Sequence, residues 1–538
     1  MKRILSFFFA VFCIVAAVAA EVPVISHEKG YYTSLARHAT RWLVQQGVPA
    51  KTYQVDELAD ALADTRIAFL VGFDAPTPAE MATLRSYRAK GGRLVVFYSS
   101  SPALAKLMGV KVLAYKKASY PGQWSKMVFQ VRTPAGVPSS IRQTSTVLQS
   151  SQPLPGRGKV MATWVDRKGK GSGEAAWIST DAGFWMSHVL LADGDEHLKA
   201  RLLAALVGSV EPTMWNAKTA DAREALQRES LRSYALAQTP RAGEIHAVWD
   251  HTGCGLYPGD WKRTMTVLKG AKVTDLFFNI AGAGFAHYPS HVLPRSRTFD
   301  DEGDQLAAAL AAAQGTGIRV HAWILCFNAT RATPERLKIF ETKGWRLKAR
   351  DGALAEYLDP ARQDVRDYII RAIDEILARY KVDGIHLDFV RWYERAAKPS
   401  DAVETMSKFV GDVRRHVRRP VWLTTAVLGK YPTCVASVAQ DWQSWLDCNL
   451  VDYVVPMDYT EDIGKFGEFV AQHSHSKSHA RRTIAGIGVT ANESRLTARQ
   501  VIDQIRLARK HGLAGVALFD LDVTLQTQIL PYLTLGIW

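Results

Sequence analysis

The chain has 538 residues, of which 47% are hydrophobic and 22% charged, and its formal net charge is +15 at pH 7. This length exceeds what one hydrophobic core supports, and the apolar content excludes a disordered protein, so we expect at least two globular domains. The excess of basic residues favours association with acidic surroundings, such as a cell envelope or an anionic glycan, because net charge bears on association rather than on fold. No nucleic-acid-binding motif accompanies the charge, and no nucleic-acid partner is expected.

The first twenty residues, MKRILSFFFAVFCIVAAVAA, have the anatomy of a secretory signal. Lys2 and Arg3 precede an apolar run that ends in small residues, and cleavage is expected after Ala19 or Ala20. A retained, uncleaved anchor is the alternative for this segment. No later stretch has the roughly eighteen uninterrupted apolar residues of a transmembrane helix. We therefore expect an exported protein, periplasmic or extracellular, with no stable membrane insertion after cleavage and with a net charge of +13 once Lys2 and Arg3 are removed.

Four cysteines follow the leader, namely Cys254, Cys326, Cys434 and Cys448, and none forms a CxxC pair. A zinc site is therefore not expected. Cys434 and Cys448 flank a predicted helix of about twelve residues, which separates them too far for a disulfide. A disulfide between Cys254 and Cys326 stays open. The histidines of 473-HSHSKSHARR-482 alternate with Ser and Lys and lack a carboxylate partner, so this run is interpreted as a basic loop rather than a metal site.

The segment from residue 21 to about 210 alternates between strands and helices, which is typical of an α/β domain. Strands are predicted at 66–73 and 93–100, and helices at 77–92 and 102–109. The first of these helices opens on a Thr-Pro pair and closes on glycines, which are favoured at these two ends. Strand, helix, strand and helix at these spacings predict parallel pairing of the strands.

This stretch resembles the class I glutamine-amidotransferase-like domain, a flavodoxin-like α/β fold that often accompanies glycoside hydrolases. Amidotransferases of this class use a cysteine nucleophile at a strand-to-helix turn, whereas the corresponding turn here is 99-SSSP-102 and the domain contains no cysteine. The resemblance therefore implies a structural or binding accessory domain. A serine hydrolase at Ser99 to Ser101 is the weaker alternative, because no GxSxG elbow frames these serines.

Residues 211–243 are charged and helical in pattern, and they are interpreted as a linker to the C-terminal domain. From 244 to 538 the chain carries eight short apolar segments, most of them separated by helical patterns. Eight strands with intervening helices predict a closed (β/α)8 TIM barrel. No shorter internal repeat competes with this architecture. The predicted strands are 245–250, 274–280, 318–325, 383–389, 421–427, 451–459, 483–489 and 514–520.

Two of these predicted strands, 383–389 and 451–459, carry an aspartate at or near their ends. The active sites of TIM barrels gather at the carboxyl ends of the strands. Because side chains alternate along a strand, His386 and Asp388 are expected to face the barrel axis, with Asp388 at the mouth. Asp458 takes the equivalent place on its own strand. We therefore expect two carboxylates that face each other across the mouth.

Such a pair of carboxylates predicts glycoside hydrolysis, in which one acid protonates the leaving oxygen while the other attacks the sugar or activates water. Arg391 favours the ionised form of the neighbouring Asp388, so Asp388 is assigned as nucleophile or base. Asp458 has less polar neighbours, which would raise its pKa, and it is assigned as general acid. Glu394 and Glu461 are alternatives for the acid, and a purely structural role for either aspartate stays open.

The C-terminal region resembles the glycosyl-hydrolase-like family ten group of exported bacterial barrels through four motifs: 319-RVHAWIL-325, 357-YLDPARQDVRDYI-369, 382-VDGIHLDFVRW-392 and 451-VDYVVPMDY-459. The resemblance implies a glycosidase that acts on an environmental polysaccharide or a cell-wall glycan, without a cofactor. Phe389 replaces a second acid that many relatives carry. Met457 and Asp458 stand where others show a glutamine-containing strand end, which leaves the identity of the acid open.

Further strand-end residues are candidates for substrate binding, since polar groups can bond sugar hydroxyls and aromatic rings can cover sugar faces. A structural role is the alternative for Asp250, and a satisfied core position is the alternative for the two histidines. The candidates are Asp250, Asn279, His321, Trp323, His386, Arg391, Trp392, Tyr459 and Asp520, with Trp249 and Trp261 as further cleft aromatics.

Two other functions compete with a carboxylate-pair hydrolase. One is a substrate-assisted N-acetylhexosaminidase-type enzyme, in which the acetamido group of the substrate attacks and Asp388 is the acid, although the DxxDxDxE strand of such enzymes is absent. The other is a carbohydrate-binding barrel without catalysis. Retention of both strand-end carboxylates favours an enzyme.

Overall fold

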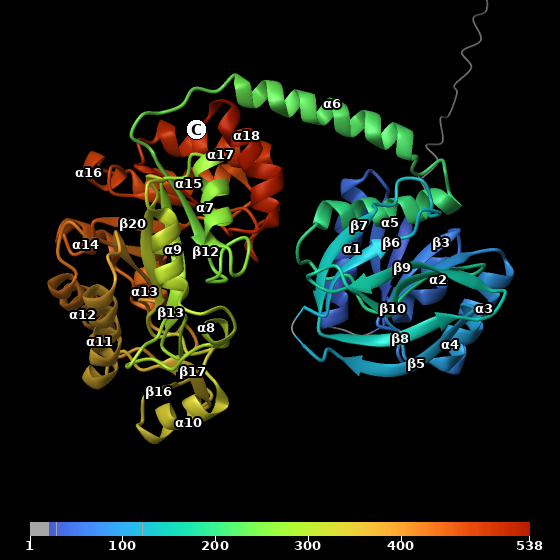
Figure 1. Cartoon of the computed structure of the whole chain (residues 1–538), viewed down its shortest axis with the longest axis horizontal. Coiled ribbons are helices and arrows are strands. Elements are labelled where there is room, and N and C mark those ends of the chain that lie inside the picture. The colour runs from blue at the N-terminus through green and yellow to red at the C-terminus, as the bar shows by residue number, and fades with distance from the viewer. Residues whose placement is uncertain (1–20, 28–29, 121) are drawn as a thin grey trace, which may run out of the picture. The chain divides into compact units, whose positions relative to one another are not determined.

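The computed structural model describes residues 21–27, 30–120 and 122–538 (Figure 1). The chain divides into two compact units between Leu226 and Gln227. The expected leader, residues 1–20, lies outside the described residues. Within the described ranges, no helix combines the length and the apolar character needed to cross a bilayer.

A mixed nine-stranded sheet forms the centre of the first unit. Its parallel strands are β1 (Val22–Ser26), β2 (Ala50–Gln54), β3 (Ile67–Val71), β4 (Arg93–Phe97) and β11 (Gly183–Met186). Its antiparallel strands are β6 (Trp124–Phe129), β7 (Ser140–Ser145), β9 (Gly158–Val165) and β10 (Gly171–Thr180). In space the order is β2-β1-β3-β4-β11-β10-β9-β6-β7. Strands β3 and β4 confirm the two predicted strands and their parallel pairing.

The antiparallel half of the sheet departs from the uninterrupted α/β pattern expected from the sequence. A second, two-stranded antiparallel sheet of β5 (Val110–Lys117) and β8 (Val147–Pro153) accompanies it. Several of these strands contain register shifts, and most mix exposed with buried residues. They therefore lack the continuous apolar runs by which buried parallel strands are recognised. The resemblance of this unit to an amidotransferase-like domain stays a prediction.

Helices cover both faces of this sheet (Figure 1). On one face, α1 (Tyr31–Gln45) and α5 (Glu196–Val210) share an apolar cluster with the strands. On the other face pack α2 (Leu58–Leu62), α3 (Pro78–Ala89) and α4 (Pro102–Leu107), and the 3-10 turn η1 (Val55–Glu57) precedes α2. Helix α3 confirms the predicted start: the Thr77 hydroxyl accepts a bond from the Glu80 N–H, and the Glu80 carboxylate accepts one from the Thr77 N–H. This reciprocal pair is a capping box.

The turn after β4, where a serine nucleophile was the alternative, is built from structural contacts. The buried Ser99 hydroxyl donates to the Phe73 carbonyl. Ser101 caps α4, since its hydroxyl accepts a bond from the Leu104 N–H at 3.3 Å. Tyr98, at the strand end, adopts a left-handed φ of 56° that turns the chain sharply. These serines are therefore engaged in holding the turn.

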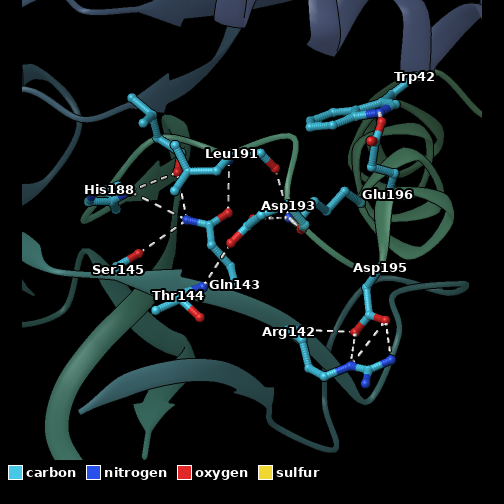
Figure 2. A network of polar contacts seen from close by, with 12 residues as sticks. Trp42, Arg142, Gln143, Thr144, Ser145, His188, Leu191, Asp193, Asp195 and Glu196 are labelled. Atoms are coloured by element: carbon cyan, nitrogen blue, oxygen red, sulfur yellow. Dashed lines mark hydrogen bonds and ion pairs between the residues drawn. The ribbon is translucent and has the colours of Figure 1, made fainter. Parts of the chain in front are cut away.

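A polar network fastens the loop before α5 onto β7 (Figure 2). The Arg142 guanidinium pairs with the Asp195 carboxylate at 2.8 Å, and the buried ammonium of Lys199 pairs with Asp193 at 2.8 Å. The side-chain amide of Gln143 lies in the same network. Burial lowers the pKa of Lys199, and the paired carboxylate offsets part of the cost of burying its charge.

Helix α6 (Ala217–Leu236) occupies the segment expected as a helical connector. Near its beginning, Asp221 and Glu224 accept ion pairs from Arg201 of α5 at 2.5 and 3.2 Å. Near its end, the Arg499 guanidinium lies 3.8 Å from the centre of the Tyr234 ring. The helix therefore carries residues of both compact units.

The second unit is the predicted (β/α)8 barrel. Eight parallel strands close through pairing of the first with the second and with the eighth. Each overlaps the segment predicted for it, which confirms the architecture. The strands are β12 (Ile245–Asp250), β13 (Asp275–Gly282), β15 (Arg319–Leu325), β18 (Gly384–Asp388), β19 (Trp422–Leu428), β20 (Tyr453–Met457), β21 (Ile484–Gly488) and β22 (Gly515–Phe519).

Helices and short strands fill the connections between the barrel strands. The short strand β14 (Phe285–Ala286) extends β13 as a hairpin, and β16 (Arg346–Lys348) pairs with β17 (Leu354–Leu358). The helices are α7 (Trp261–Gly270), α8 (Arg297–Glu302), α9 (Gln305–Ala313), α10 (Pro334–Thr342), α11 (Gln363–Arg379), α12 (Ala402–His416), α13 (Thr433–Val438), α14 (Trp442–Asp447), α15 (Ile463–His473), α16 (Lys477–Ala480), α17 (Ala498–Lys510), the π-helix η2 (Leu525–Ile529) and α18 (Leu530–Gly536).

Side chains of the barrel strands alternate between two apolar clusters. On β18, Ile385 and Leu387 belong to the cluster shared with the surrounding helices. The interior cluster contains the rings of Trp249 and Trp323. Gly486 on β21 leaves space for the first of these, because a Cβ atom there would lie 2.9 Å from the Trp249 ring. Aromatic side chains therefore occupy the barrel interior, and the missing side chain of Gly486 makes room for one of them.

Candidate active site

Asp388 ends β18 on the interior face of the barrel, as expected from the alternation of that strand. Its side chain is 5% exposed, and its Oδ1 atom accepts a bond of 2.6 Å from the Phe389 N–H. Burial raises the pKa of Asp388, whereas the Arg391 charge, the Phe389 N–H and the Trp323 indole act in the opposite direction. Arg391 therefore acts in the expected direction, but loss of solvent is the larger effect, and the net result is a raised pKa.

The chain turns sharply after Asp388. Phe389 adopts φ 54°, a left-handed conformation that costs a residue with a side chain about 1–2 kcal/mol. The Tyr357 hydroxyl holds the turn, at 3.1 Å from the Phe389 carbonyl and 2.7 Å from the Arg391 carbonyl. The Arg391 guanidinium stacks 4.3 Å from the centre of the Phe389 ring. Local strain of this kind clusters at functional sites, and here it fixes the direction of the acid at the strand tip.

Asp458 lies away from the mouth, contrary to the expected pairing with Asp388. It is fully buried, and its Oδ1 atom contacts the His473 Nε2 atom of α15 at 2.9 Å. Its strand alternates as predicted, but the face shared by Val454 and Asp458 packs toward the helices, while Val455 belongs to the interior cluster. Burial raises the pKa of Asp458, yet a carboxyl sealed against α15 has no access to substrate.

Asp520, which follows β22, supplies the second carboxyl at the mouth. Burial and the nearby charges of Asp250 and Asp522 raise its pKa to about 8. Its side chain retains partial exposure, and its Oδ1 atom accepts bonds from the N–H groups of His251 at 3.1 Å and Leu521 at 2.7 Å. A carboxyl with this pKa carries a proton at neutral pH, which is the property required of a general acid.

Asp388 and Asp520 stand on opposite sides of the barrel. Four steps separate β18 from β22 in either direction around the closed sheet, and β20 lies midway between them on one side. Tyr459, just beyond β20, has its pKa raised by burial and by the charges of both Asp388 and Asp520. Asp458 and Glu493 also raise the pKa of Tyr459. The three residues belong to one mouth because each lies at or just beyond the carboxyl end of its parallel strand, with Tyr459 on the strand midway between the two carboxyls.

Aromatic rings line this mouth. Tyr459 and Phe519 stack with centroids 5.5 Å apart, and Trp249 meets each of them edge-on at 6.4 and 6.1 Å. The exposed His251 lies 5.9 Å from both Trp323 and Phe519. Trp249 and Trp323 are buried, whereas Tyr459 and Phe519 are partly exposed and His251 is exposed, so these last three rings can present a face to a sugar.

Beneath the mouth, His386 is a satisfied core residue. Its Nε2 atom accepts a bond from the Trp249 indole N–H at 3.0 Å, which leaves Nδ1 to donate to the Thr424 hydroxyl at 2.8 Å. The ring stacks on Phe277 at 4.2 Å, and burial lowers its pKa well below the usual value. His386 is therefore neutral and does not reach substrate.

Asn279 on β13 is fully buried, and neither polar atom of its side chain has a hydrogen-bond partner among the described residues. It pairs in register with Trp323 of the neighbouring strand, and two further residue pairs follow before the ladder ends. Buried amides are normally bonded. This side chain therefore has both a donor and an acceptor available for a hydroxyl group or a water molecule.

His321 lies at the opposite end of the barrel from the mouth, which contradicts a role in substrate binding. Its Nε2 atom contacts the Asp275 carboxylate at 2.8 Å, and Arg319 pairs with the same carboxylate at 2.7 Å. Asp275 and Arg319 are the first residues of β13 and β15. In TIM barrels the amino ends of the strands serve stability rather than catalysis.

Two further candidates are structural, which corrects their expected contact with substrate. Trp392 is buried in the cluster shared with the helices, and its indole N–H donates to the Ala397 carbonyl at 3.1 Å. Asp250 is fully buried, and both carboxylate oxygens accept backbone N–H bonds, from Thr252 and Gly253 on one and from Gly255 on the other. Trp261 likewise packs in the helix-side cluster rather than at the mouth.

The described part of the chain contains no disulfide: Cys254 is partly exposed, Cys326 and Cys434 are buried, and Cys448 is exposed. Nor do the described residues include a group of three or more His, Cys, Asp or Glu side chains that could hold a metal ion. In the histidine-rich run, His473 contacts Asp458 and His479 contacts Asp447 at 2.6 Å.

Comparison with known proteins places part of the barrel near glycosyl hydrolases. The family model described as Glycosyl hydrolase-like 10 matches residues 256–423, a stretch that includes Asp388. The barrel is similar to glycoside hydrolases. Glycosyl hydrolase DigH of Escherichia coli (strain K12) is 26% identical over 159 residues, which cover 26% of this chain and 36% of DigH. The chain thus matches about a third of the length of this relative. The family model and the DigH match support a glycoside-hydrolase-type function for the barrel.

Further similarities are more distant. An S-layer-related protein of Niallia circulans is 38% identical over 69 residues, which are 13% of this chain and 4% of that protein. Among solved structures, the PgaB (BpsB) glycoside hydrolase domain from Bordetella bronchiseptica covers 51% of this chain and 93% of that chain, with 13% identity and a TM-score of 0.41. The spore cortex-lytic enzyme SleL of Bacillus cereus covers 55% of this chain and 74% of that chain, with 12% identity and a TM-score of 0.35.

Sequence reasoning did not find His251 and Arg331 beside the mouth, nor the buried His287, which contacts Arg331. His251 directly follows the strand-end Asp250, so its position beyond β12 was the signal that could have found it. Arg331 and His287 stand in long connections after β15 and β13, whose course the sequence pattern does not specify. The loop packing that brings these two side chains together is described below.

Proposed function

We propose that the barrel is a glycoside hydrolase that cleaves O-glycosidic bonds of a polysaccharide or cell-wall glycan, with Asp388 and Asp520 as its carboxyl pair. The observation that carries the proposal is their arrangement: two carboxyls from opposite strands flank one aromatic-lined mouth, and both act on Tyr459 between them. Paired carboxyls with different environments are the machinery of glycoside hydrolysis.

The surroundings of the two carboxyls support different roles. Asp520 has a pKa of about 8, so it holds its proton at neutral pH and gives it to the leaving oxygen of the glycosidic bond. At Asp388, Arg391 and the Phe389 N–H offset part of the rise in pKa that burial causes, so we assign this carboxyl to attack the sugar or to activate water from the other side. The role of general acid therefore passes from Asp458 to Asp520.

The remaining groups of the mouth supply binding. The partly exposed rings of Tyr459 and Phe519 offer apolar faces to sugars. The amide of Asn279 offers a donor and an acceptor to hydroxyl groups. We also propose that the protein acts outside the cytoplasm, on the basis of the leader-like residues 1–20 and the basic net charge.

The test is release of reducing ends from a panel of glycans: peptide-free cell-wall strands, chitin oligosaccharides and mannan. We expect release by the wild-type protein and a fall of about 100-fold or more in Asp388→Asn and in Asp520→Asn, since each removes an acid–base group. Asp458→Asn is the matched control, because it neutralises a buried carboxyl outside the mouth, and its rate should stay within about threefold of wild type once folding is verified.

Other outcomes assign other functions. Undiminished release by Asp388→Asn would remove that residue from the mechanism. Tight binding of a glycan with no release by any variant would favour a carbohydrate-binding barrel. Loss in Asp388→Asn alone, together with a strict requirement for an acetamido group on the substrate, would favour the substrate-assisted mechanism.

A further inference from the structure

Arg331, in the loop after β15, holds its guanidinium in a fixed position beside the mouth. The group lies 4.1 Å from the centre of the Phe285 ring, and its Nη2 atom is 3.3 Å from the His287 Nε2 atom. Phe285 belongs to the interior cluster that includes Trp249 and Trp323. The Arg331 side chain is otherwise exposed. The guanidinium is therefore supported on two sides and open on the others.

The backbone around Arg331 is held by close packing of two loops. Gly284, in the hairpin between β13 and β14, lies against Ala332: a Cβ atom at Gly284 would be 2.3 Å from the Ala332 Cβ atom and 2.7 Å from its Cα atom. Any side chain at Gly284 would push the two loops apart. Arg331 is thus placed by the fold rather than by its own flexibility.

The charge of Arg331 lacks a counterion among the described residues. No carboxylate lies within ion-pair distance of it there, and its hydrogen-bond partner His287 is neutral, because burial and the Arg331 charge lower the pKa of that imidazole to about 3. The Asp250 charge acts to raise the pKa of Arg331, but both carboxylate oxygens of Asp250 already accept bonds from N–H groups of the loop that follows Asp250. A guanidinium has five N–H donors, so most of them stay available for a ligand.

Arg331 also lies close to the proposed sugar-binding surface. Its charge lowers the pKa of His251, and the His251 ring is 5.9 Å from Trp323. A sugar that packs on the exposed His251 ring would therefore bring a neighbouring ring of the same glycan toward the guanidinium. The open N–H fork of an arginine matches a carboxylate, which it binds through two parallel hydrogen bonds.

We propose that Arg331 forms a carboxylate-binding subsite at the rim of the mouth, which receives an acidic sugar of the glycan chain. This inference rests on the proposed function, because it needs the glycan to occupy the mouth. The subsite would make an acidic glycan a better ligand than the same glycan with its carboxyl groups neutralised.

The test compares acidic glycans with their carbodiimide-amidated forms. The probes are peptide-free cell-wall strands, polygalacturonate and alginate, and binding is measured to the Asp388→Asn protein at physiological ionic strength, so that surface charge is screened. We expect at least one acidic glycan to bind about tenfold or more tightly than its amidated form. Arg331→Gln should abolish this preference, and Arg331→Lys should restore part of it, because lysine keeps the charge but lacks the fork.

Arg499→Gln is the matched control. It removes the same charge from a guanidinium that also stacks on an aromatic ring, on α17 outside the barrel mouth, and it should leave the preference unchanged. The proposal is overturned if no acidic glycan is preferred over its amidated form, or if the preference survives Arg331→Gln. The binding measurement does not depend on cleavage. A barrel that hydrolyses no glycan would refute the proposed function, whereas the comparison of acidic with amidated glycans would still test the subsite.

Discussion

Asp520 provides a prediction in which loss of activity comes with a gain in stability. Its pKa is raised from 3.8 to about 8, so the folded protein binds this proton more tightly than the unfolded chain does. Between about pH 4 and pH 8 the folded state therefore carries more protons at this site, and stability contributed by the protonated carboxyl is lost as the pH rises through this interval. Replacement by asparagine removes the titration and keeps an oxygen that accepts the His251 and Leu521 N–H bonds.

The size of the effect follows from the shift. One pKa unit corresponds to about 1.4 kcal/mol, so the full shift would correspond to roughly 5–6 kcal/mol. Asp520 is partly open to solvent and interacts with other carboxyls, so we expect a smaller gain, about 2–3 kcal/mol for Asp520→Asn above pH 8. Below pH 4 the variant and the wild type should have the same stability.

The assay is chemical denaturation of both proteins between pH 4 and pH 9, followed by amide hydrogen exchange in the barrel strands so that the first unit does not obscure the transition. The free-energy difference between variant and wild type should grow with pH and level off near pH 8. A difference that is constant with pH, or a variant that is less stable at pH 9, would show that folding does not raise the pKa of Asp520. The reason to assign Asp520 as the general acid would then be lost.

Three further predictions concern the mouth and its support. The rate of glycan cleavage should fall about tenfold per pH unit above pH 8, as Asp520 loses its proton, and a pH–rate profile that stays flat to pH 10 would exclude it as the acid. Asp458→Ala should lower the free energy of unfolding by about 1–3 kcal/mol, because the buried His473 Nε2 atom loses its hydrogen-bond partner; an unchanged denaturation midpoint would contradict this. Gly486→Ala should cost about 1–3 kcal/mol, because its Cβ atom would lie 2.4 Å from the Pro456 carbonyl oxygen and 2.9 Å from the Trp249 ring. Gly411→Ala on the helix α12, where a Cβ atom meets only Leu450 at 3.9 Å, should be neutral or stabilising by up to about 1 kcal/mol in the same assay.

The architecture of the barrel could be predicted because each of its strands is a short apolar run bounded by polar turns. Buried parallel strands have this appearance whatever their order in the sheet. The antiparallel half of the first unit could not be predicted in the same way. Strands such as β7 and β10 mix buried and exposed residues and contain register shifts, so neither periodicity nor hydrophobicity marks them strongly.

The candidate site was predicted in part. Asp388 follows from strand alternation and from the general position of barrel active sites. The same alternation showed that Val454 and Asp458 share a face, but a period of two does not say which face meets the helices. That choice depends on His473, which lies fifteen positions further along the chain.

Other features of the mouth arise from contacts between distant segments. The high pKa of Asp520 requires Asp250, which stands at the other end of the barrel sequence. The position of Arg331 depends on the packing of Gly284 against Ala332, which no local pattern in either loop encodes. Residue types along the sequence could therefore suggest carboxylate chemistry. The neighbouring residues that shift the pKa values and fix the side-chain positions are brought together only when the barrel closes.

The most direct test of the carboxyl pair is a crystal structure of the Asp388→Asn protein with an oligosaccharide of the glycan it binds. Our account predicts that a glycosidic oxygen lies within hydrogen-bond reach of the Asp520 carboxyl, with residue 388 on the other side of the same bond and a sugar ring against Tyr459 or Phe519. A sugar chain bound away from the mouth, or one whose glycosidic oxygens all lie beyond the reach of Asp520, would contradict it.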